Sequence, residues 1–160
     1  MRFNLMENPM AAKFAKRFAN AAMVLEQSAL PKATQELVSL RASQINGCGF
    51  CADMHTKDAA AAGETAVRLN LVATWRESTV FTDAERAALA LAEEGTRLAD
   101  AHTGVSDETW ELARKYYDDD QLAALVSLVA LINAANRMSV IVRNPGGSYQ
   151  PGMFDSFVSN

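Results

Sequence analysis

The sequence lacks most of the features that mark common functional classes. Among its 160 residues there are only two cysteines and two histidines, and we find no internal repeat, low-complexity tract or glycine-rich phosphate-binding loop. Strict alternation of apolar and polar residues is also absent, which argues against β-strands. The missing glycine-rich loop removes the usual sequence signal for nucleotide binding. What remains is a pattern of helical periodicity with one concentrated cluster of reactive side chains.

The chain also lacks a basic excess. Its net charge is -4, which gives no electrostatic footprint for nucleic acid or an anionic membrane surface, so we expect neither partner. The first residues contain no basic segment followed by a long apolar one, so we expect no secretory signal and a cytoplasmic location. In a reducing compartment, two cysteines spaced CxxC indicate redox or metal chemistry rather than a structural disulfide.

Composition and periodicity together predict the fold class. With 49% hydrophobic and 21% charged residues, the chain is long enough to bury one core, and we expect a single domain over residues 1–160. The pattern predicts an all-α protein, an antiparallel helical bundle. We expect helices near residues 10–27, 31–45, 48–62, 64–73, 83–98, 107–116 and 121–143. The last of these is the most apolar and should form the buried centre, and its polar interruptions make it unsuitable as a membrane span.

The reactive cluster is a CxxC motif followed by a histidine. If a helix begins near Cys48, then Cys48, Cys51 and His55 occupy positions i, i+3 and i+7. These positions form one stripe on a helix surface. Two sulfur atoms and an imidazole therefore lie along the same face.

A carboxylate upstream belongs to the same arrangement. Glu36 lies in the preceding helix, ten residues before Asn46, and His55 lies eight residues after Gly47. If Asn46-Gly47 turns the chain into a helical hairpin, a rise of about 1.5 Å per residue places both groups at roughly the same level. We therefore expect Glu36 and His55 to share a proton, either directly or through a water.

This arrangement suits a redox dithiol. A thiolate is the reactive form of cysteine, and helix-terminal amides together with a nearby base lower the thiol pKa. Oxidation of one cysteine by a hydroperoxide would give a sulfenic acid, which the other cysteine, one turn away, can convert to a disulfide. A zinc site is an alternative, with Cys48, Cys51 and His55 as ligands, but its fourth ligand would have to be His102, Glu36 or Asp53. Another is a protein that uses the cysteines only for packing and acts through binding.

For several other residues we favour a structural interpretation. We expect His102 to be a solvated loop residue, and Trp75 with Arg76 to serve packing and a surface ion pair rather than a pocket mouth. The side chains of Asn133, Asn136 and Arg137 would be costly to bury without partners, so we expect them to bond to neighbouring backbone or to another subunit rather than to line the cysteine pocket. The apolar tail, residues 144–160, is a candidate subunit contact.

The residues around the motif resemble a known family. The spacing of Glu36, the CxxC pair and His55 on a helical hairpin is similar to the core motif of the alkylhydroperoxidase D (AhpD) and carboxymuconolactone decarboxylase (CMD) family, in its small cysteine-bearing type. The resemblance covers about residues 32–150. It extends to LRASQINGC at 40–48, DMH at 53–55, AGE at 62–64, WR at 75–76 and LIN at 131–133.

The resemblance implies a thiol-dependent peroxidase without a cofactor or bound metal. Cys51 would form the sulfenic acid, Cys48 would resolve it to a disulfide, and Glu36 with His55 would relay protons. A thiol or dithiol reductant, such as a thioredoxin-like or lipoyl protein, would reset the site, and the assembly would be a homo-oligomer, a trimer or hexamer. A disulfide reductase or redox sensor would need the same residues.

The sequence departs from the family pattern at one position between the cysteines. AhpD has a histidine where this chain has Phe50, so its peroxidase rate and reductant do not transfer directly. The decarboxylases proper lack the cysteine pair, which argues against lactone decarboxylation. Cys48 also lies nearer the helix N-terminus than Cys51, so the helix amides should stabilise its thiolate more strongly. This disagrees with the resemblance, which makes Cys51 the cysteine that attacks the peroxide.

Overall fold

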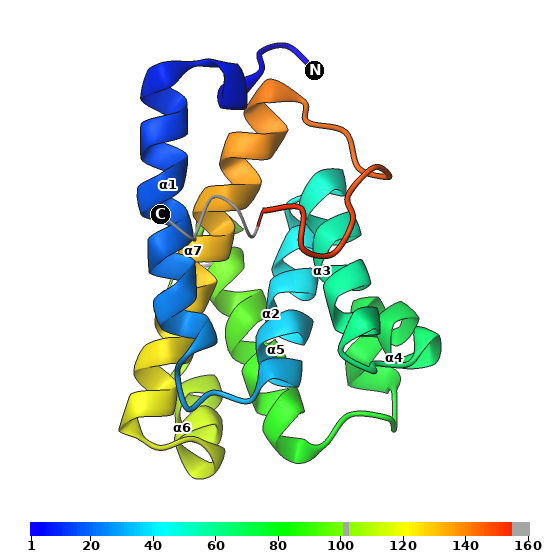
Figure 1. Cartoon of the computed structure of the whole chain (residues 1–160). Helices are drawn as coiled ribbons and strands as arrows, with labels where there is room; N and C mark the ends of the chain where they lie inside the picture. The colour runs from blue at the N-terminus through cyan, green and yellow to red at the C-terminus, as the bar shows by residue number, and fades with distance from the viewer. Residues whose placement is uncertain (101–102, 155–160) are drawn as a thin grey trace.

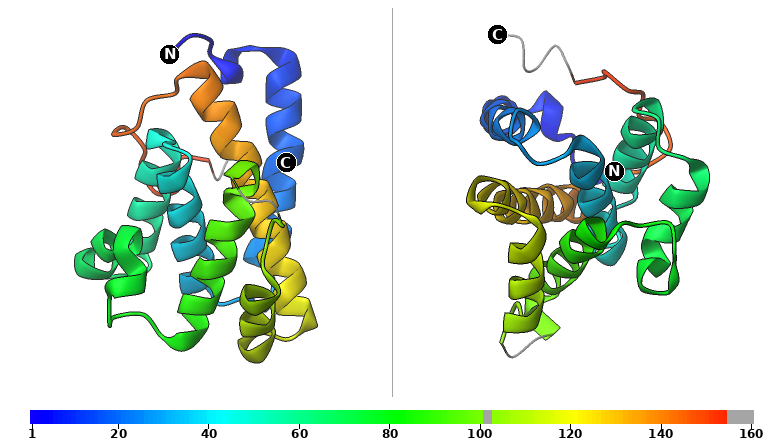
Figure 2. Two further views of the ribbon diagram at one scale, coloured as in Figure 1. Left: turned by 180° about the vertical axis from the view of Figure 1, so that it is seen from behind. Right: turned by 90° about the horizontal axis from the view of Figure 1, so that it is seen from below.

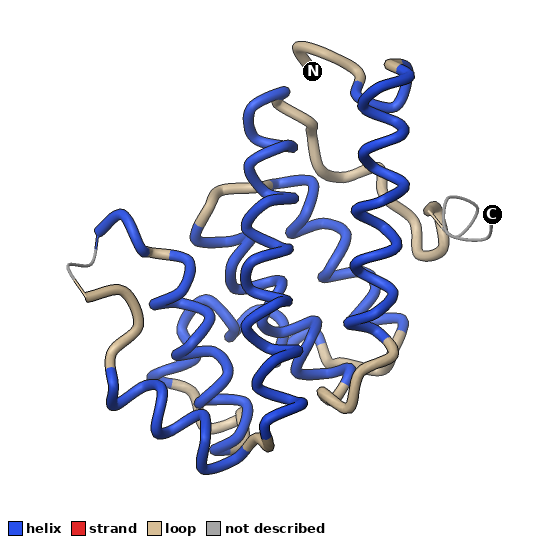
Figure 3. Tube along the Cα trace, turned by 90° about the vertical axis from the view of Figure 1, so that its left-hand side faces the viewer, coloured by secondary structure: helices blue, strands red, loops and turns tan. Residues whose placement is uncertain are grey.

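The computed structural model describes residues 1–100 and 103–154, and every regular element within these ranges is helical (Figures 1 and 3). This confirms the predicted all-α class. Three short 3-10 segments are Leu5–Glu7 (η1), Val72–Glu77 (η2) and Leu98–Asp100 (η3). The α-helices are α1 (Pro9–Glu26), α2 (Lys32–Ile45), α3 (Gly49–Ala61), α4 (Ala66–Leu71), α5 (Asp83–Thr96), α6 (Asp107–Tyr116) and α7 (Asp119–Val142). His102 lies outside the described residues.

Local capping signals explain why most helix starts agree with the sequence. Thr82 and Glu85 form the predicted capping box of α5, and Ser106 caps α6 by accepting a hydrogen bond from Thr109 N. Asp118 caps α7 in the same manner. A glycine marks the C-terminal end of α3. Gly63 adopts a φ of +99°, a left-handed conformation that would be strained for a residue with a side chain.

The buried centre of the bundle is α2, which packs against α3, α5 and α7 (Figure 2). Nine of its 14 residues are buried, whereas α7 buries eight of 24 and leaves Val126 and Ile141 exposed. The expectation that α7 would be the centre was therefore wrong. Hydropathy alone does not identify the central helix, because α2 is buried although it carries many polar side chains. These side chains find hydrogen-bonding partners inside the protein. Gln35 Nε2 donates to Leu30 O at 2.8 Å, for example.

The most apolar helix also passes a simple test for a membrane span. By length and hydropathy, α7 is the one helix among the described residues that could cross a membrane, although the core helix of a globular protein passes the same test. Our expectation that its polar residues would disqualify it on composition was wrong. In the structure α7 packs against α1, α2 and α5, and the amide of Asn133 donates to Thr96 Oγ1 at 3.0 Å. We describe it as a helix of the bundle.

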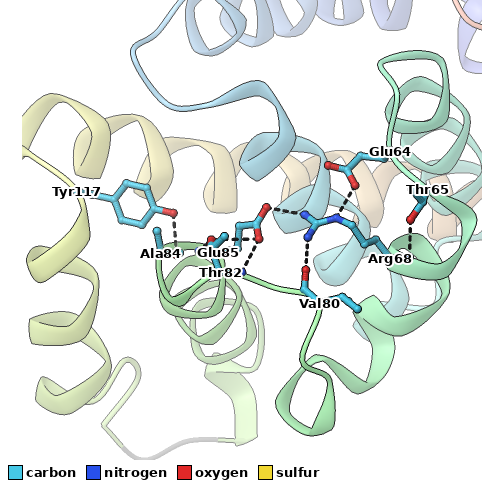
Figure 4. A network of polar contacts seen from close by, with 8 residues as sticks. All are labelled: Glu64, Thr65, Arg68, Val80, Thr82, Ala84, Glu85 and Tyr117. Atoms are coloured by element: carbon cyan, nitrogen blue, oxygen red, sulfur yellow. Dashed lines mark hydrogen bonds and ion pairs between the residues drawn. The ribbon is translucent and has the colours of Figure 1, made fainter.

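A network around Arg68 fixes the segment that connects α4 to α5 (Figure 4). Its guanidinium forms ion pairs with Glu64 at 2.7 Å and Glu85 at 2.6 Å and donates to the Val80 carbonyl. The predicted helix over 64–73 is shorter as an α-helix and continues as η2. Within η2, Trp75 is buried and Arg76 pairs with Glu93 at 3.0 Å, which confirms the structural interpretation of the Trp-Arg pair.

Candidate functional site

The site lies on the hairpin formed by α2 and α3, as the sequence predicted. Asn46 ends α2, and Gly47 then adopts a φ of +65°, which explains the need for glycine in the turn. The backbone N–H of Cys48 donates to Ser43 O at 2.9 Å, so the turn is bonded to the helix before it. Cys48 is the N-cap of α3 and Cys51 lies in its first turn.

The two cysteines are joined as a disulfide across this first turn. Their Cα atoms lie 5.4 Å apart, and each residue is only 2% exposed. The sulfur of Cys48 also accepts a hydrogen bond from the backbone N–H of Cys51, at 3.2 Å. Because a helix-terminal amide stabilises negative charge on its acceptor, this geometry favours a thiolate at Cys48 when the pair is reduced.

Glu36 and His55 form a direct hydrogen bond between the two helices. The distance from Glu36 Oε2 to His55 Nδ1 is 2.8 Å, and Lys32 Nζ lies 2.9 Å from the other carboxylate oxygen. Glu36 and His55 therefore lie at the same level of the hairpin, as the helical rise predicted. An Nδ1–H that donates to the carboxylate leaves Nε2 as the proton acceptor of a neutral imidazole. Nε2 is buried and has no hydrogen-bonding partner among the residues that the structure describes.

The electrostatics of this pair depend on its burial. Glu36 is 5% exposed, and burial by itself raises the pKa of its carboxyl group. The hydrogen bond and charge of His55, followed by those of Lys32, outweigh burial and hold the pKa of Glu36 below its ordinary value. Burial lowers the pKa of Lys32, but its contact with Glu36 reverses the effect and raises it. Glu36 is therefore ionised near neutral pH.

A small apolar cavity opens beside the imidazole. Its volume is about 120 Å³, and α1, α2, α3 and α7 all contribute to its walls. Phe18 and Leu25 come from α1, and Ile132 and Ala135 come from α7, while Glu36 and His55 provide polar groups. Ile132 and Ala135 also pack against the two cysteines. The cavity is thus lined by the imidazole and is separated from the sulfur pair by Ile132 and Ala135.

A polar network anchors the hairpin turn to α7. The side-chain amide of Asn46 donates to the Oδ1 atoms of Asn133 and Asn136, each at 2.9 Å. Asn136 in turn donates to Ser43 Oγ at 3.1 Å, and Arg137 donates to Asn133 O at 3.0 Å. The prediction of bonds to neighbouring backbone is confirmed for Arg137 and for Asn133, whose amide donates to Val129 O at 2.9 Å, whereas Asn136 bonds to side chains. These polar residues hold the turn that carries Cys48, which gives them a positioning role.

A segment beside the site was not connected to it by the sequence. Residues 144–154, which we call the C-terminal strap, leave the end of α7 and pass beside α3 (Figures 1 and 2). Asp53 accepts hydrogen bonds from the backbone N–H groups of Gly147 and Tyr149 in this strap, at 2.8 and 3.1 Å. No periodic signal could have revealed this contact, because it joins residues more than ninety positions apart. Phe157 and Val158, part of the predicted subunit contact, lie outside the described residues.

The same structure allows the zinc-site alternative to be compared with the positions of its candidate ligands. Of the fourth zinc ligands that we considered, Asp53 is bonded to the strap, and Glu36 is bonded to Lys32 and His55. Among the described residues no three metal-ligating side chains converge on one point. The zinc hypothesis therefore has no structural support here, and it stays open to direct measurement of bound metal.

Fold and site together define a class of protein: an all-α bundle of the AhpD-like type with a close cysteine pair at the junction of two hairpin helices. The chain belongs to the carboxymuconolactone decarboxylase family, whose sequence model matches residues 9–94. YdfG of Bacillus subtilis, an uncharacterised protein, is 39% identical over 123 residues, which are 77% of this chain and 82% of YdfG. The resemblance inferred from the Glu, CxxC and His spacing is thereby confirmed.

Solved structures support the same class. ATU0492 from Agrobacterium tumefaciens is a protein of unknown function provisionally called an antioxidant defence protein AhpD. It superposes with a TM-score of 0.85 at 32% identity, covering 92% of this chain and 99% of its own. A peroxidase-related protein with an AhpD core from Ralstonia eutropha has a TM-score of 0.69 at 20% identity, covering 92% of this chain and 71% of its own. The second likeness shows the fold alone.

Proposed function

We propose that the chain is a thiol-dependent hydroperoxide reductase that serves antioxidant defence. The observation that carries the proposal is the partly buried hydrogen bond between Glu36 and His55, one helical turn from a cysteine pair at a helix N-terminus. This combination supplies a nucleophile, a resolving thiol and an oriented base. The family relationship and the provisional description of ATU0492 as an antioxidant defence protein support the same chemistry.

The proposed reaction begins at Cys51. Nε2 of His55 accepts the thiol proton, and the Cys51 thiolate attacks the terminal oxygen of the hydroperoxide ROOH. The O–O bond breaks, the sulfur becomes a sulfenic acid, and the RO⁻ leaving group takes a proton from the imidazolium to give the alcohol. Glu36 stabilises the imidazolium through Nδ1, because a carboxylate paired with a histidine favours its charged form.

Cys48 completes the oxidative half of the cycle. Its thiolate attacks the sulfur of the sulfenic acid, the S–O bond breaks, and the hydroxide that leaves takes up a proton to become water. The product is the Cys48–Cys51 disulfide. A dithiol reductant then restores both thiols by exchange and supplies the two electrons that the hydroperoxide has consumed. The net reaction converts ROOH and a dithiol into ROH, water and a disulfide.

The cavity beside His55 provides a route for the hydroperoxide. Its apolar walls can accommodate an organic group while the peroxide oxygen faces Nε2, the buried nitrogen without a partner among the described residues. The reductant is proposed to be a thioredoxin-like or lipoyl protein, and the working form to be a homo-oligomer. Lactone decarboxylation, which the family name suggests, is not proposed, because the chemistry of this site centres on the cysteine pair.

A disulfide reductase or redox sensor is the second candidate. The observation that favours it is Phe50, an apolar residue between the cysteines with no capacity for proton transfer. Such a protein would exchange disulfides with a thiol partner at a useful rate, while consuming hydroperoxide slowly. Comparing the two turnover rates in one preparation separates the candidates.

Cysteine variants test the proposal directly. Purified protein with a dithiol reductant should consume an organic hydroperoxide, and Cys51→Ser should abolish turnover. Cys48→Ser should stop turnover as well but leave a sulfenic acid on Cys51, detectable as a dimedone adduct by mass spectrometry. Full activity in Cys51→Ser would refute the proposed function. Stoichiometric zinc by elemental analysis, with thiols that resist oxidation, would favour the metal-binding alternative.

A further inference from the structure

The helix that carries the cysteines presents two functional faces. Met54 and His55 face the cavity between α1 and α7, whereas Gly49, Phe50 and Asp53 face the C-terminal strap. At about 100° per residue, His55 lies on a different side of α3 from Gly49, Phe50 and Asp53. Cys48, Cys51 and His55 share one stripe of α3, and Phe50 packs against the cysteines, so the strap meets the sulfur pair through Phe50.

Polar contacts fasten the strap to α3. The carboxylate of Asp53 accepts the two backbone N–H groups of Gly147 and Tyr149, and Lys57 Nζ donates to the carbonyl groups of the same two residues, at 3.2 and 2.8 Å. Asp53 and Lys57 also pair with each other at 2.8 Å, one helical turn apart. The strap backbone is therefore bonded to α3 through the oppositely charged side chains of Asp53 and Lys57.

Aromatic packing extends this attachment to the residue between the cysteines. The ring of Phe50 lies edge-on to Tyr149 and Phe154, with centroids 6.5 and 6.2 Å away, and Tyr149 and Phe154 stack on each other at 5.9 Å. The Tyr149 hydroxyl donates to Asp58 at 2.9 Å. Gly146 lies so close that an added Cβ would clash with the carbonyl group of Gly49. The strap thus lies directly on the first turn of α3.

The packing of the strap on α3 conflicts with the access to sulfur that thiol–disulfide exchange requires. An attacking thiolate must reach one sulfur of the disulfide, form a mixed disulfide and let the second thiol of the reductant release the product. Both cysteines are only 2% exposed, and their inner side is filled by α2 and α7 through Ala42 and Ile132. Phe50 also packs against the cysteines, and the strap packs on Phe50 and Gly49.

We propose that Phe50 and the C-terminal strap form a gate that selects the reductant, separate from the cavity through which the hydroperoxide arrives. This inference rests on the proposed function only in taking Cys48 and Cys51 as the redox centre. Reduction proceeds from the fraction of molecules in which the strap has left α3. A protein-borne dithiol needs a wider opening than a small one, so the gate sets the ratio of their rates.

The test measures the two half-reactions separately in Asp53→Ala, which removes the acceptor for both strap amides. Asp100→Ala, an exposed aspartate in η3, is the matched control. Oxidised protein is mixed with thioredoxin or with dithiothreitol, and thiol formation is followed by quenched alkylation. We expect reduction by thioredoxin to accelerate about tenfold in Asp53→Ala, because charge-assisted hydrogen bonds that hold the strap are lost. Dithiothreitol should gain less, and oxidation by a hydroperoxide should stay within about twofold.

A second variant keeps the charges and displaces the strap by size. Gly146→Ala places a methyl group against the Gly49 carbonyl, and it should accelerate reduction in the same direction as Asp53→Ala. Unchanged reduction rates in both variants would overturn the gate. Equal changes in reduction and oxidation would also overturn it, because they would indicate a general effect on the hairpin. If the parent consumes no hydroperoxide, the proposed function fails, while the reduction rates still decide the gate.

Discussion

Replacing Glu36 by glutamine separates a proton relay from a buried structural carboxylate. The substitution preserves shape and helix propensity but removes the charge that holds His55 Nδ1–H and Lys32 Nζ, at 2.8 and 2.9 Å. An amide can present either its oxygen or its NH₂ group to Nδ1, so it no longer fixes the imidazole tautomer. Nε2, which has no partner among the described residues, would then no longer be held as the proton acceptor.

The expected loss of activity is larger than the expected loss of stability. A positioned general base contributes about 10² to 10⁴ in rate, so the initial rate of hydroperoxide reduction at pH 7 should fall at least about tenfold. Replacing charge-assisted hydrogen bonds by neutral ones should cost roughly 1–2 kcal/mol of unfolding free energy. The protein should therefore remain folded, with an intact ability to form the disulfide.

The pH dependence gives a second readout of the same variant. Because the pKa of Glu36 in the folded protein lies below its ordinary value of 4.5, the ionised carboxylate stabilises the fold above that pH. This contribution is lost as the pH falls through the lowered pKa, and Glu36→Gln should lack that part of the acid destabilisation. The pKa of the reactive thiol should rise, so activity should recover partly at alkaline pH.

The assay is a pH series of initial rates, together with the rate of thiol alkylation, for the parent and for Glu36→Gln. Glu111→Gln, at an exposed position on α6, is the control for loss of a carboxylate. Parental rates and an unchanged pH profile in Glu36→Gln would refute the relay. A loss of rate that no alkaline pH restores would indicate a different role for the carboxylate.

Two further predictions concern structure and assembly. Asn136→Ala should destabilise the protein by about 2–3 kcal/mol in urea unfolding, because Asn46 and Ser43 lose a fully buried partner, whereas Asn70→Ala at an exposed position should not. The chain should be a homo-oligomer in light scattering, because Phe14 is 52% and Ile141 67% exposed. A monomer of 17.3 kDa at micromolar concentration would contradict this.

The sequence predicted the parts of the molecule that depend on short-range geometry. Helix starts at Thr82 and Ser106 follow from capping side chains, and the level of Glu36 with His55 follows from helical rise on the two sides of one turn. These quantities involve residues at most about twenty positions apart. Their prediction required no knowledge of how the remaining helices pack.

Contacts between distant segments could not be predicted in the same way. The cavity needs Phe18 of α1 and Ile132 of α7 to meet beside His55, and neither residue carries a signal of its own beyond being apolar. The central position of α2 was missed because buried polar groups such as Gln35 appear exposed until their hydrogen-bonding partners are known. The strap depends on Asp53, an ordinary acidic residue by sequence.

The geometry also bears on the division of labour between the cysteines. Cys48 is the helix N-cap and its sulfur accepts the amide of Cys51, so helix electrostatics favours the thiolate at Cys48. Cys51 lies one turn before His55, so the imidazole is suited to remove its proton. A stabilised thiolate is the better leaving group in exchange and is ionised before the sulfenic acid forms. The helix amides and the proposed roles are therefore consistent with each other if Cys48 is the resolving cysteine and is already ionised. Cys51 is then activated only by the Glu36–His55 pair.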